Sequence, residues 1–384
     1  MSKGIRIFLV ILVSIVLLYL SLLLAGSFLF SGRSIYSIPL LVTTLSLIVY
    51  LYIKIVNKGS SRICNFFLVG SLILLILVIL YKESPRIYGN YVGKVGNEIN
   101  LRDYAPFQPD TKAVQLSEFS SLRITEDLPR LDGATALYPI YSAFAQAVYP
   151  EAQYNPWSSV VRCSKTGRAY ENLFENKADI IFAAAPSKEH TEYAKSQGLT
   201  LELTPIGYEA FVFFVNKKNP IEGLTIQQVR DIYSGEITNW NQVSGKEGKI
   251  IAFQRPANSG SQTMLERVMA SHPIMEPQKK EVVDGMGGII HRAAEYTNYK
   301  NSIGYSFLFF TTRMVANKKI RILKIEGVEP SQETIKNKKY PFSGQFYAIT
   351  VKEHRSNKNV DTFIKWVLSS QGQEIVKKTG YLSL

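Results

Sequence analysis

The hydrophobic positions divide the chain into two parts of different character. In the first part, apolar residues form three long runs at Ile7–Phe30, Ile38–Ile55 and Ile63–Tyr81, and the first acidic residue of the chain is Glu83. A helix needs about 20 apolar residues to cross the hydrocarbon core of a bilayer. The core of a water-soluble protein does not extend over so long a stretch without a carboxylate. The pattern therefore predicts three transmembrane helices within residues 1–82.

The first apolar run shares one feature with a secretory signal, because Lys3 and Arg6 precede it. The apolar region of an ordinary signal has about 7–15 residues. Here the run is longer, and two more apolar runs follow it. We therefore expect a helix that is retained in the membrane.

Basic residues beside the runs indicate the orientation. Five lie at the N-terminus and in the second connection (Lys3, Arg6, Lys54, Lys58, Arg62), and three lie in the first connection and after the third run (Arg33, Lys82, Arg86). Positive charge is enriched on the cytoplasmic side of membrane proteins. We expect a cytoplasmic N-terminus, and three spans then place the C-terminal part outside the cytoplasm.

Polar residues dominate after the third run. Glycines and prolines interrupt residues 83–130, which we interpret as an extracytoplasmic stalk or connector with short strands at Tyr88–Val92 and Val114–Phe119. From residue 131 onward short strands and helices alternate, which is typical of an α/β domain. The predicted strands are Ile180–Ala184, Phe211–Val215, Ile250–Gln254, Ser302–Ser306 and Phe346–Val351. The predicted helices are Ile140–Tyr149, Arg168–Glu175, Ile226–Ser234, Gln262–Ser271 and Val360–Leu368.

The composition excludes several classes of function. The net charge is +13, but the part after Lys82 carries only +6 of it, which does not indicate nucleic-acid binding. The four histidines are scattered, and neither Cys64 nor Cys163 has a metal-binding neighbour. The sequence contains no recognisable nucleophile–base pair, Walker loop or pair of catalytic carboxylates. We therefore expect no enzyme, no metal and no cofactor.

Three glycine-containing turns stand in front of predicted helices, at Asp132–Leu137, Ser164–Gly167 and Arg255–Thr263. The start of a helix offers unpaired backbone N–H groups and the positive end of the helix dipole. Each turn alone is compatible with an ordinary helix cap. The third is the most specific, because it combines a cation, two hydroxyls and a glycine. Three such helix starts aimed at one point would bind a small tetrahedral oxyanion without a metal.

Four stretches of the segment 131–384 resemble, in order, the phosphate-binding proteins that serve ABC transporters, within the type 2 periplasmic-binding-protein class. They are Asp-Gly-Ala-Thr-Ala-Leu-Tyr-Pro at 132–139, Ala-Asp-Ile-Ile-Phe-Ala-Ala-Ala-Pro-Ser at 178–187, residues 224–240 with the loop 255–263, and Ser-Ile-Gly-Tyr-Ser at 302–306. The resemblance does not cover the membrane region, where most members have a cleavable signal or a lipid anchor.

The resemblance implies an α/β fold with two lobes, in which mixed sheets are flanked by helices and two crossover strands join the lobes. With the predicted spans, the expected division is a three-helix transmembrane region (1–82), the connector (83–130) and a solute-binding domain (131–384). Lobe one would comprise 131–213 and 311–384, and lobe two 216–309. The crossovers would lie near Phe213–Val215 and Tyr305–Phe310.

Carried over by position, the resemblance places phosphate-binding groups at Thr135, Ala136, Thr166, Arg255, Ser259, Gly260 and Ser261. The family usually has an aspartate before the Ala-Pro pair, which accepts the proton of a protonated phosphate and thereby excludes sulfate. Here that position is Ala184, and the family's second acidic position is Ala257. Conceivable replacements, each also compatible with a surface charge or a cap, are Asp132, Glu171, Glu209 and Asp284. We therefore expect relaxed discrimination against sulfate.

The implied function is extracytoplasmic capture of phosphate, or of a related oxyanion, by a membrane-anchored binding protein. The expected partners are the permease and ATPase subunits of an ABC transporter and the lipid bilayer. The alternative is a membrane protein that senses the oxyanion without transporting it. The short connections between the apolar runs favour capture, whereas three spans exceed what a tether needs, so both hypotheses stay open.

Overall fold

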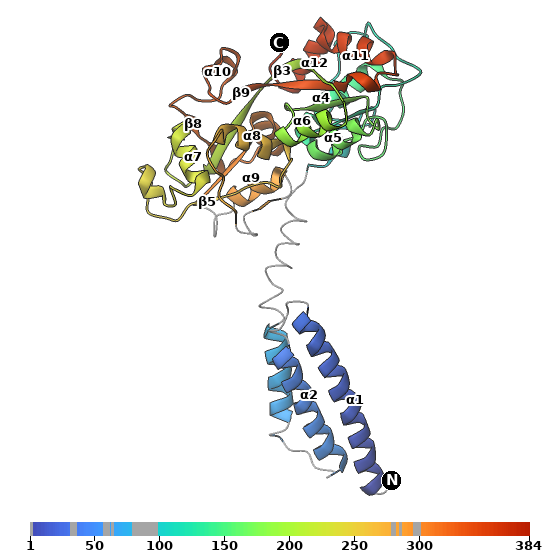
Figure 1. The fold of residues 1–384 in the computed structure, drawn as a ribbon, viewed down its shortest axis with the longest axis vertical. Coiled ribbons are helices and arrows are strands. Elements are labelled where there is room, and N and C mark those ends of the chain that lie inside the picture. The colour runs from blue at the N-terminus through green and yellow to red at the C-terminus, as the bar shows by residue number, and fades with distance from the viewer. Residues whose placement is uncertain are drawn as a thin grey trace. The chain divides into compact units, whose positions relative to one another are not determined.

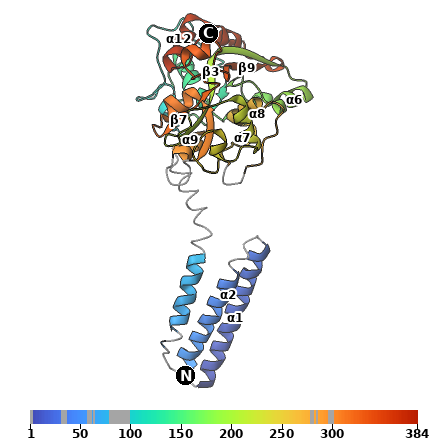
Figure 2. The same ribbon diagram turned by 90° about the vertical axis from the view of Figure 1, so that its left-hand side faces the viewer.

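The computed structural model describes residues 3–30, 37–56, 62, 65–78, 99–277, 282–283, 286–294 and 301–384. The chain separates into two compact units, Met1–Val95 and Gly96–Leu384. Figures 1 and 2 show the helices of the first unit in blue and the sheet-containing second unit in green to red.

The first unit is helical. Helix α1 (Lys3–Phe30) packs beside α2 (Ser37–Leu51), which continues as the π-helical turn η2 (Tyr52–Val56), as Figure 2 shows. A further apolar helix covers Asn65–Val78. Most of the large apolar side chains of these helices are exposed, as expected for a surface that faces lipid.

Two of these helices are long and apolar enough to span a membrane, over Lys3–Ser27 with 25 residues and Ser37–Ile55 with 19 residues. The third apolar helix is shorter. Residues 79–98 lie outside the described part of the chain, and so does Cys64. The structure thus supports two candidate spans, and the third span at Ile63–Tyr81 stays a prediction.

The second unit is built on one mixed, seven-stranded sheet. Its order is β1-β2-β9-β3-β6-β5, and β7 also pairs with β3. The strands are β1 (Leu131–Gly133), β2 (Ile180–Ala183), β3 (Leu201–Asn216), β5 (Ile251–Ala252), β6 (Ser302–Phe307), β7 (Ile320–Ile322) and β9 (Ser343–Val351). A small second sheet pairs β4 (Gly223–Leu224) with β8 (Lys324–Ile325).

The long strand β3 belongs to both halves of this sheet. Its first part pairs antiparallel with β9, up to Ala210 opposite Ser343. Its second part pairs antiparallel with β6, beginning with Phe211 opposite Phe307. The run Phe211–Val215 is buried on both faces, which explains its unbroken apolar sequence. The change of partner between Ala210 and Phe211 marks the crossover between two lobes.

Helices cover each end of the sheet, as Figure 1 shows. Lobe one carries α4 (Tyr138–Val148), α5 (Thr166–Phe174), α6 (Lys188–Ser196), α11 (Asn359–Leu368) and α12 (Ser370–Thr379). Lobe two carries α7 (Ile226–Ser234), α8 (Gly260–Met269), α9 (Met286–Ala294) and α10 (Gln332–Lys336). Separate buried clusters lie on the two sides, one around Phe144 and Phe182 and the other around Phe213 and Tyr233.

All five predicted strands and all five predicted helices of the binding domain are confirmed, most of them with shifted ends. The agreement is closest for α7, which begins and ends where the sequence predicts. The short strand predicted at Val114–Phe119 is absent: these described residues have an irregular backbone with a bend at Ser117 and Glu118. The strand predicted at Tyr88–Val92 lies outside the described residues.

The chain does not return to lobe one at residue 311, as the resemblance implied. Strand β7 pairs with the second half of β3, with Phe214 opposite Ile322, and β8 pairs with β4. Tyr340 is buried in the core of lobe two. The chain therefore returns to lobe one at β9 rather than at residue 311, because strand pairing holds the intervening segment on lobe two.

The segment 99–130, interpreted from sequence as part of a connector, packs on lobe one. Leu101, Ala113 and Ile124 are buried in the same cluster as Phe144. The backbone N–H of Ser121 donates to Gln371 of α12 at 2.8 Å. In the described residues this segment completes the core of lobe one.

Candidate functional site

The predicted binding residues gather between the two lobes. A cavity of about 430 Å³ is lined by Thr135, Thr166, Arg255, Ser259 and Gly260. A smaller cavity of about 40 Å³ is lined by Ala136, Thr166 and Gly260, together with Ala184 and Glu209. Thr166 and Gly260 belong to both walls and separate the two spaces. Ser261 lines neither cavity, although it directly follows Gly260.

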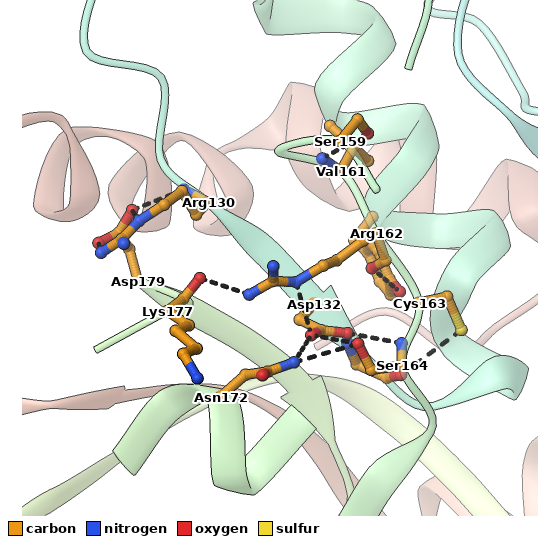
Figure 3. A network of polar contacts seen from close by, with 12 residues as sticks. Arg130, Asp132, Ser159, Val161, Arg162, Cys163, Ser164, Asn172, Lys177 and Asp179 are labelled. Atoms are coloured by element: carbon orange, nitrogen blue, oxygen red, sulfur yellow. Dashed lines mark hydrogen bonds and ion pairs between the residues drawn. The ribbon is translucent and has the colours of Figure 1, made fainter. Parts of the chain in front are cut away.

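The two loops of lobe one are held together by Asp132, whose side chain is completely buried. One carboxylate oxygen, Oδ1, accepts the N–H groups of Gly133 and Ser164 at 2.8 and 2.7 Å. The other, Oδ2, accepts the Ser164 hydroxyl and the Asn172 amide at 2.8 Å each, and the Arg162 Nε–H at 3.0 Å. Figure 3 shows the contacts of Arg162, Ser164 and Asn172 converging on Asp132. Because five donors already bond to this carboxylate, it holds the two loops in place rather than accepting a hydrogen bond from a ligand; we call it the hub of lobe one.

The local sequence explains why helices begin at these loops. Gly133 is required by packing, because a Cβ there would lie 2.4 Å from the Phe182 carbonyl oxygen. The 3₁₀ turn η4 (Thr135–Leu137) follows at once and leads into α4. In the second loop Lys165 has a φ of 70°, and α5 begins at the next residue, Thr166. Both turns thus bring helix starts, with their backbone N–H groups, to the cavity walls.

The third loop belongs to lobe two. Ser259 caps α8 by accepting the Gln262 N–H at 3.3 Å. The side-chain oxygen of Gln262 accepts the Arg255 N–H at 3.0 Å, and the Tyr305 hydroxyl oxygen accepts the same N–H at 2.9 Å. The Tyr305 hydroxyl also donates to Gln262. Arg255 itself is buried, with 8% of its surface exposed, so its positive charge lies at the cavity wall rather than in bulk water.

Ser261 is the second residue of α8 and is 1% exposed. Its hydroxyl has no hydrogen-bond partner among the described residues. Buried hydroxyls are nearly always paired, by protein, water or ligand. Ser261 itself lines neither cavity, but it follows Gly260, which lines both, so its hydroxyl is a candidate donor to a ligand at this helix start.

The two lobes touch across the cavity. A Cβ at Gly260 would lie 2.8 Å from the Thr166 hydroxyl oxygen, so only glycine allows this approach. Beside it, the Asn258 amide of lobe two donates to Glu189 of lobe one at 2.7 Å. Arg267 of α8 donates to the Pro186 carbonyl at 2.7 Å. The cleft is therefore in a closed arrangement.

The four acidic residues considered as replacements for the family aspartate differ in their surroundings. Asp132 is fully engaged, as described above. Glu171 is exposed on α5 and pairs with Arg168. Asp284 lies outside the described residues. Glu209 is the one of the four that lines the smaller cavity together with Ala184.

Histidine and cysteine occur singly around the cleft in the described part of the chain. In the described ranges no three His, Cys, Asp or Glu side chains cluster as metal ligands would. His190 closes a capping box with Ser187 at the start of α6 and stacks on Tyr170. Burial raises the pKa of the Cys163 thiol to about 11, which keeps it protonated near neutral pH.

Sequence patterns missed several residues that shape the cleft. Gln262 and Tyr305 position the Arg255 loop, and Asn258 joins the lobes. Gln262 lies in the first turn of a helix, where a polar residue is ordinary. Nothing in its local pattern indicates that its amide reaches back to Arg255.

The sequence matches the family described as PBP superfamily domain over residues 127–371. The phosphate-binding protein PstS of Borreliella burgdorferi is 28% identical over 206 residues, which are 52% of this chain and 72% of that protein. The PstS of Pseudomonas aeruginosa is 29% identical over 211 residues, which are 50% of this chain and 63% of that protein.

Two solved structures share the fold. One is assigned as a phosphate ABC transporter substrate-binding protein, with bound phosphate, from Clostridium perfringens. It aligns with a TM-score of 0.53 and 23% identity over 68% of this chain and 99% of its own. The other is an ABC-type phosphate transport receptor from Vibrio cholerae, with a TM-score of 0.51 and 19% identity over 68% of this chain and all of its own.

The fold and the cavity between its lobes define a two-lobed α/β binding protein. The family match covers more than half of the chain, and the chain belongs to the PBP superfamily.

Proposed function

We propose that this protein captures phosphate, or a closely related tetrahedral oxyanion, in the interlobe cleft and delivers it to the permease of an ABC transporter. The observation that carries the proposal is the meeting of three helix starts and one buried arginine at adjoining cavities. Two helix starts come from lobe one and the third comes from lobe two, so an anion between them would hold the lobes together.

The chemistry of these groups suits an oxyanion. Helix starts present backbone N–H donors and a positive dipole end, and they bind phosphate in many proteins. The Arg255 guanidinium adds a permanent charge in a geometry that matches two oxygens. The proposed donors are the backbones of Thr135, Ala136 and Gly260, with the hydroxyls of Thr166 and Ser261. Ser259 serves as the α8 cap, and its proposed contribution is the position of that helix start.

The names of the related proteins support phosphate as the ligand. The curated relatives reported above are named phosphate-binding proteins, and the Clostridium structure contains phosphate. The region of similarity includes all three loops, because the family match runs from residue 127 to 371. These relationships are the basis for choosing phosphate among the tetrahedral anions.

The proposal includes attachment to the membrane. Two apolar helices of sufficient length support anchoring. We further propose that the segment Ile63–Tyr81 forms a third span, that the N-terminus is cytoplasmic, and that the binding unit lies outside the cytoplasm. The division into 1–82, 83–130 and 131–384 belongs to this proposal, with the qualification that residues 99–130 pack on lobe one.

Isothermal titration calorimetry on the full chain in detergent tests the ligand. Phosphate is expected to bind the wild-type protein, and Arg255→Ala is expected to weaken binding by about 2–5 kcal/mol, at least about 30-fold. The matched control is Arg123→Ala, because Arg123 is exposed and lies away from the cleft. Absence of phosphate binding by the wild type at neutral pH and low salt would sink the assignment. Equal affinity of Arg255→Ala and wild type would remove Arg255 from the site.

A further inference from the structure

Glu209 lies on β3, immediately before the residue pair at which this strand leaves lobe one. Its Oε1 accepts the N–H of Ala210 at 2.9 Å. The N–H of Phe309, on the segment that follows β6, is shared by Oε1 and Oε2 at 3.4 and 3.3 Å. The carboxyl group therefore bridges the two chain segments that connect the lobes.

The same side chain lines the 40 Å³ cavity with Ala136, Thr166, Ala184 and Gly260. Three of these residues belong to the helix starts that we assign to the oxyanion. A cavity so small brings its lining groups within a few ångströms of anything bound in it. Of the described residues that line this space, Glu209 is the one with an acidic side chain.

The carboxyl group has bonding capacity left for a ligand. An ionised carboxylate offers about four acceptor positions, and a protonated one has an O–H to donate. The backbone bonds described above use part of this capacity on each oxygen. The remaining capacity is open to a group bound beside this side chain.

Burial raises the pKa of Glu209 to about 8, although N–H groups of Ala210, Phe309 and Leu308 lower it in part. No charged side chain of the described residues is among the causes of this shift. The neighbouring titratable group is Tyr381, whose pKa burial holds well above its usual value. Arg313, on the turn η7 (Phe310–Val315), is exposed. Near neutral pH the Glu209 carboxyl is therefore mostly protonated.

We propose that Glu209 determines which oxyanion the cleft accepts, by donating a hydrogen bond from its protonated carboxyl to the bound anion. This inference rests on the proposed function, because it assigns a role within the same site. A donor at this position suits an anion without protons, whereas an ionised carboxylate would repel it. The cleft then accepts sulfate as well as phosphate, and loses affinity for sulfate when Glu209 ionises.

The direction of the pH dependence follows from linkage. An anion bound beside Glu209 favours its protonated form, so binding raises the pKa of Glu209 above its value in the free protein. The affinity for sulfate is therefore highest below pH 8 and falls as the pH rises through that value. At pH 9.5, above that pKa, the free protein is mostly ionised at Glu209, so the affinity for sulfate falls by about tenfold or more.

The experiment compares the wild type, Glu209→Gln and Glu202→Gln as full chains in detergent, by calorimetry with sodium sulfate and sodium phosphate at pH 6.5 and 9.5. Glutamine keeps a donor at every pH. Glu202 is the matched control, since it lies on the same strand and pairs at the surface with Arg355. Sulfate does not titrate in this range, so its pH dependence reports on the protein.

For sulfate, the wild type and Glu202→Gln are expected to lose about tenfold or more in affinity at pH 9.5, while Glu209→Gln keeps its pH 6.5 affinity. Titrations at pH 9 in two buffers of different ionisation enthalpy should show uptake of up to one proton by the wild type. This second measurement needs no variant and stands if Glu209→Gln fails to fold.

Three outcomes contradict the inference. If the wild type binds phosphate but rejects sulfate at pH 6.5, Glu209 does not act as a donor. If the wild type and Glu209→Gln share one pH profile, or sulfate binding takes up no proton, Glu209 has no part in selecting the anion. These results leave phosphate capture intact. Failure of the wild type to bind either anion would instead overturn the proposed function and this inference with it.

Discussion

The two halves of the candidate site are held in place by different chemistry. In lobe one a buried carboxylate, Asp132, collects five donors and fixes both loops at once. In lobe two the backbone N–H of Arg255 is accepted by two uncharged groups, the Gln262 amide oxygen and the Tyr305 hydroxyl. In lobe one the negative charge of Asp132 organises the loops, whereas in lobe two the positive charge of Arg255 lies at the cavity wall.

This difference has a physical reason. The Asp132 carboxylate already accepts hydrogen bonds from five donors of lobe one. It can therefore lie near an anion site without competing for the donors that would bind the anion. The two groups that hold the Arg255 backbone N–H are neutral, so these supports place no negative charge beside its guanidinium. An arrangement with a carboxylate supporting the Arg255 loop would weaken its attraction for an anion. Three substitutions test the comparison.

The largest loss of stability is expected for Asp132→Ala. This change leaves Arg162 and several buried donors without their acceptor, and we expect a loss of about 3–5 kcal/mol in the free energy of unfolding. Urea unfolding of the full chain in detergent, followed by tryptophan fluorescence, measures it. Asp361→Ala is the control, because Asp361 is 58% exposed and its pair with Arg355 should contribute no more than about 1 kcal/mol. A similar loss for both variants would contradict the hub role of Asp132.

An intermediate effect is expected for Gln262→Leu. The variant keeps the size of the side chain but removes the acceptor for the Arg255 N–H and the Tyr305 hydroxyl. We expect the free energy of unfolding to fall by about 1–3 kcal/mol. Phosphate affinity should fall as well, because the Arg255 backbone N–H loses one of the two acceptors described above. Unfolding and calorimetry measure the two effects. Gln227→Leu serves as control, since Gln227 contacts only Asp231 at the surface of α7 in the described structure. Unchanged phosphate affinity would mean that Tyr305 alone positions the loop.

The smallest effect is expected for Glu189→Ala, which removes the contact with Asn258 across the cleft mouth. This exposed bond should contribute about 0.5–1 kcal/mol to closure, so phosphate should dissociate roughly two- to five-fold faster. Stopped-flow measurement of phosphate release checks it. In Glu192→Ala, a neighbour on α6 whose partner is Lys188 on the same helix, release should not change. Equal release rates in all three proteins would show that this contact does not hold the cleft closed.

Local patterns were sufficient for much of the fold. The apolar period and the Thr225 capping box define α7 within nine residues, and the predicted bounds hold. The three helix starts are visible for the same reason, because caps and glycines act on neighbours in sequence. The first half of β3 was not predicted, since Leu201–Pro205 are only partly buried and lack a clear alternation. Helices α6 and α12 were missed because their sequences are mainly polar.

The sequence by itself determined the apolar N-terminal helices, the alternation of strands and helices, and the three loops with Arg255. Only the tertiary structure decided which lobe each segment joins and what surrounds each acidic group. Strand β7 joins lobe two by pairing Ile322 with Phe214, and Glu209 meets Phe309 across 100 residues of sequence. Such pairings depend on packing between distant segments, which leaves no local pattern. For that reason the sequence could name both Asp132 and Glu209 as candidate ligand carboxylates. Only the fold showed that the hydrogen bonds of Asp132 are satisfied within the protein, whereas Glu209 lines the smaller cavity.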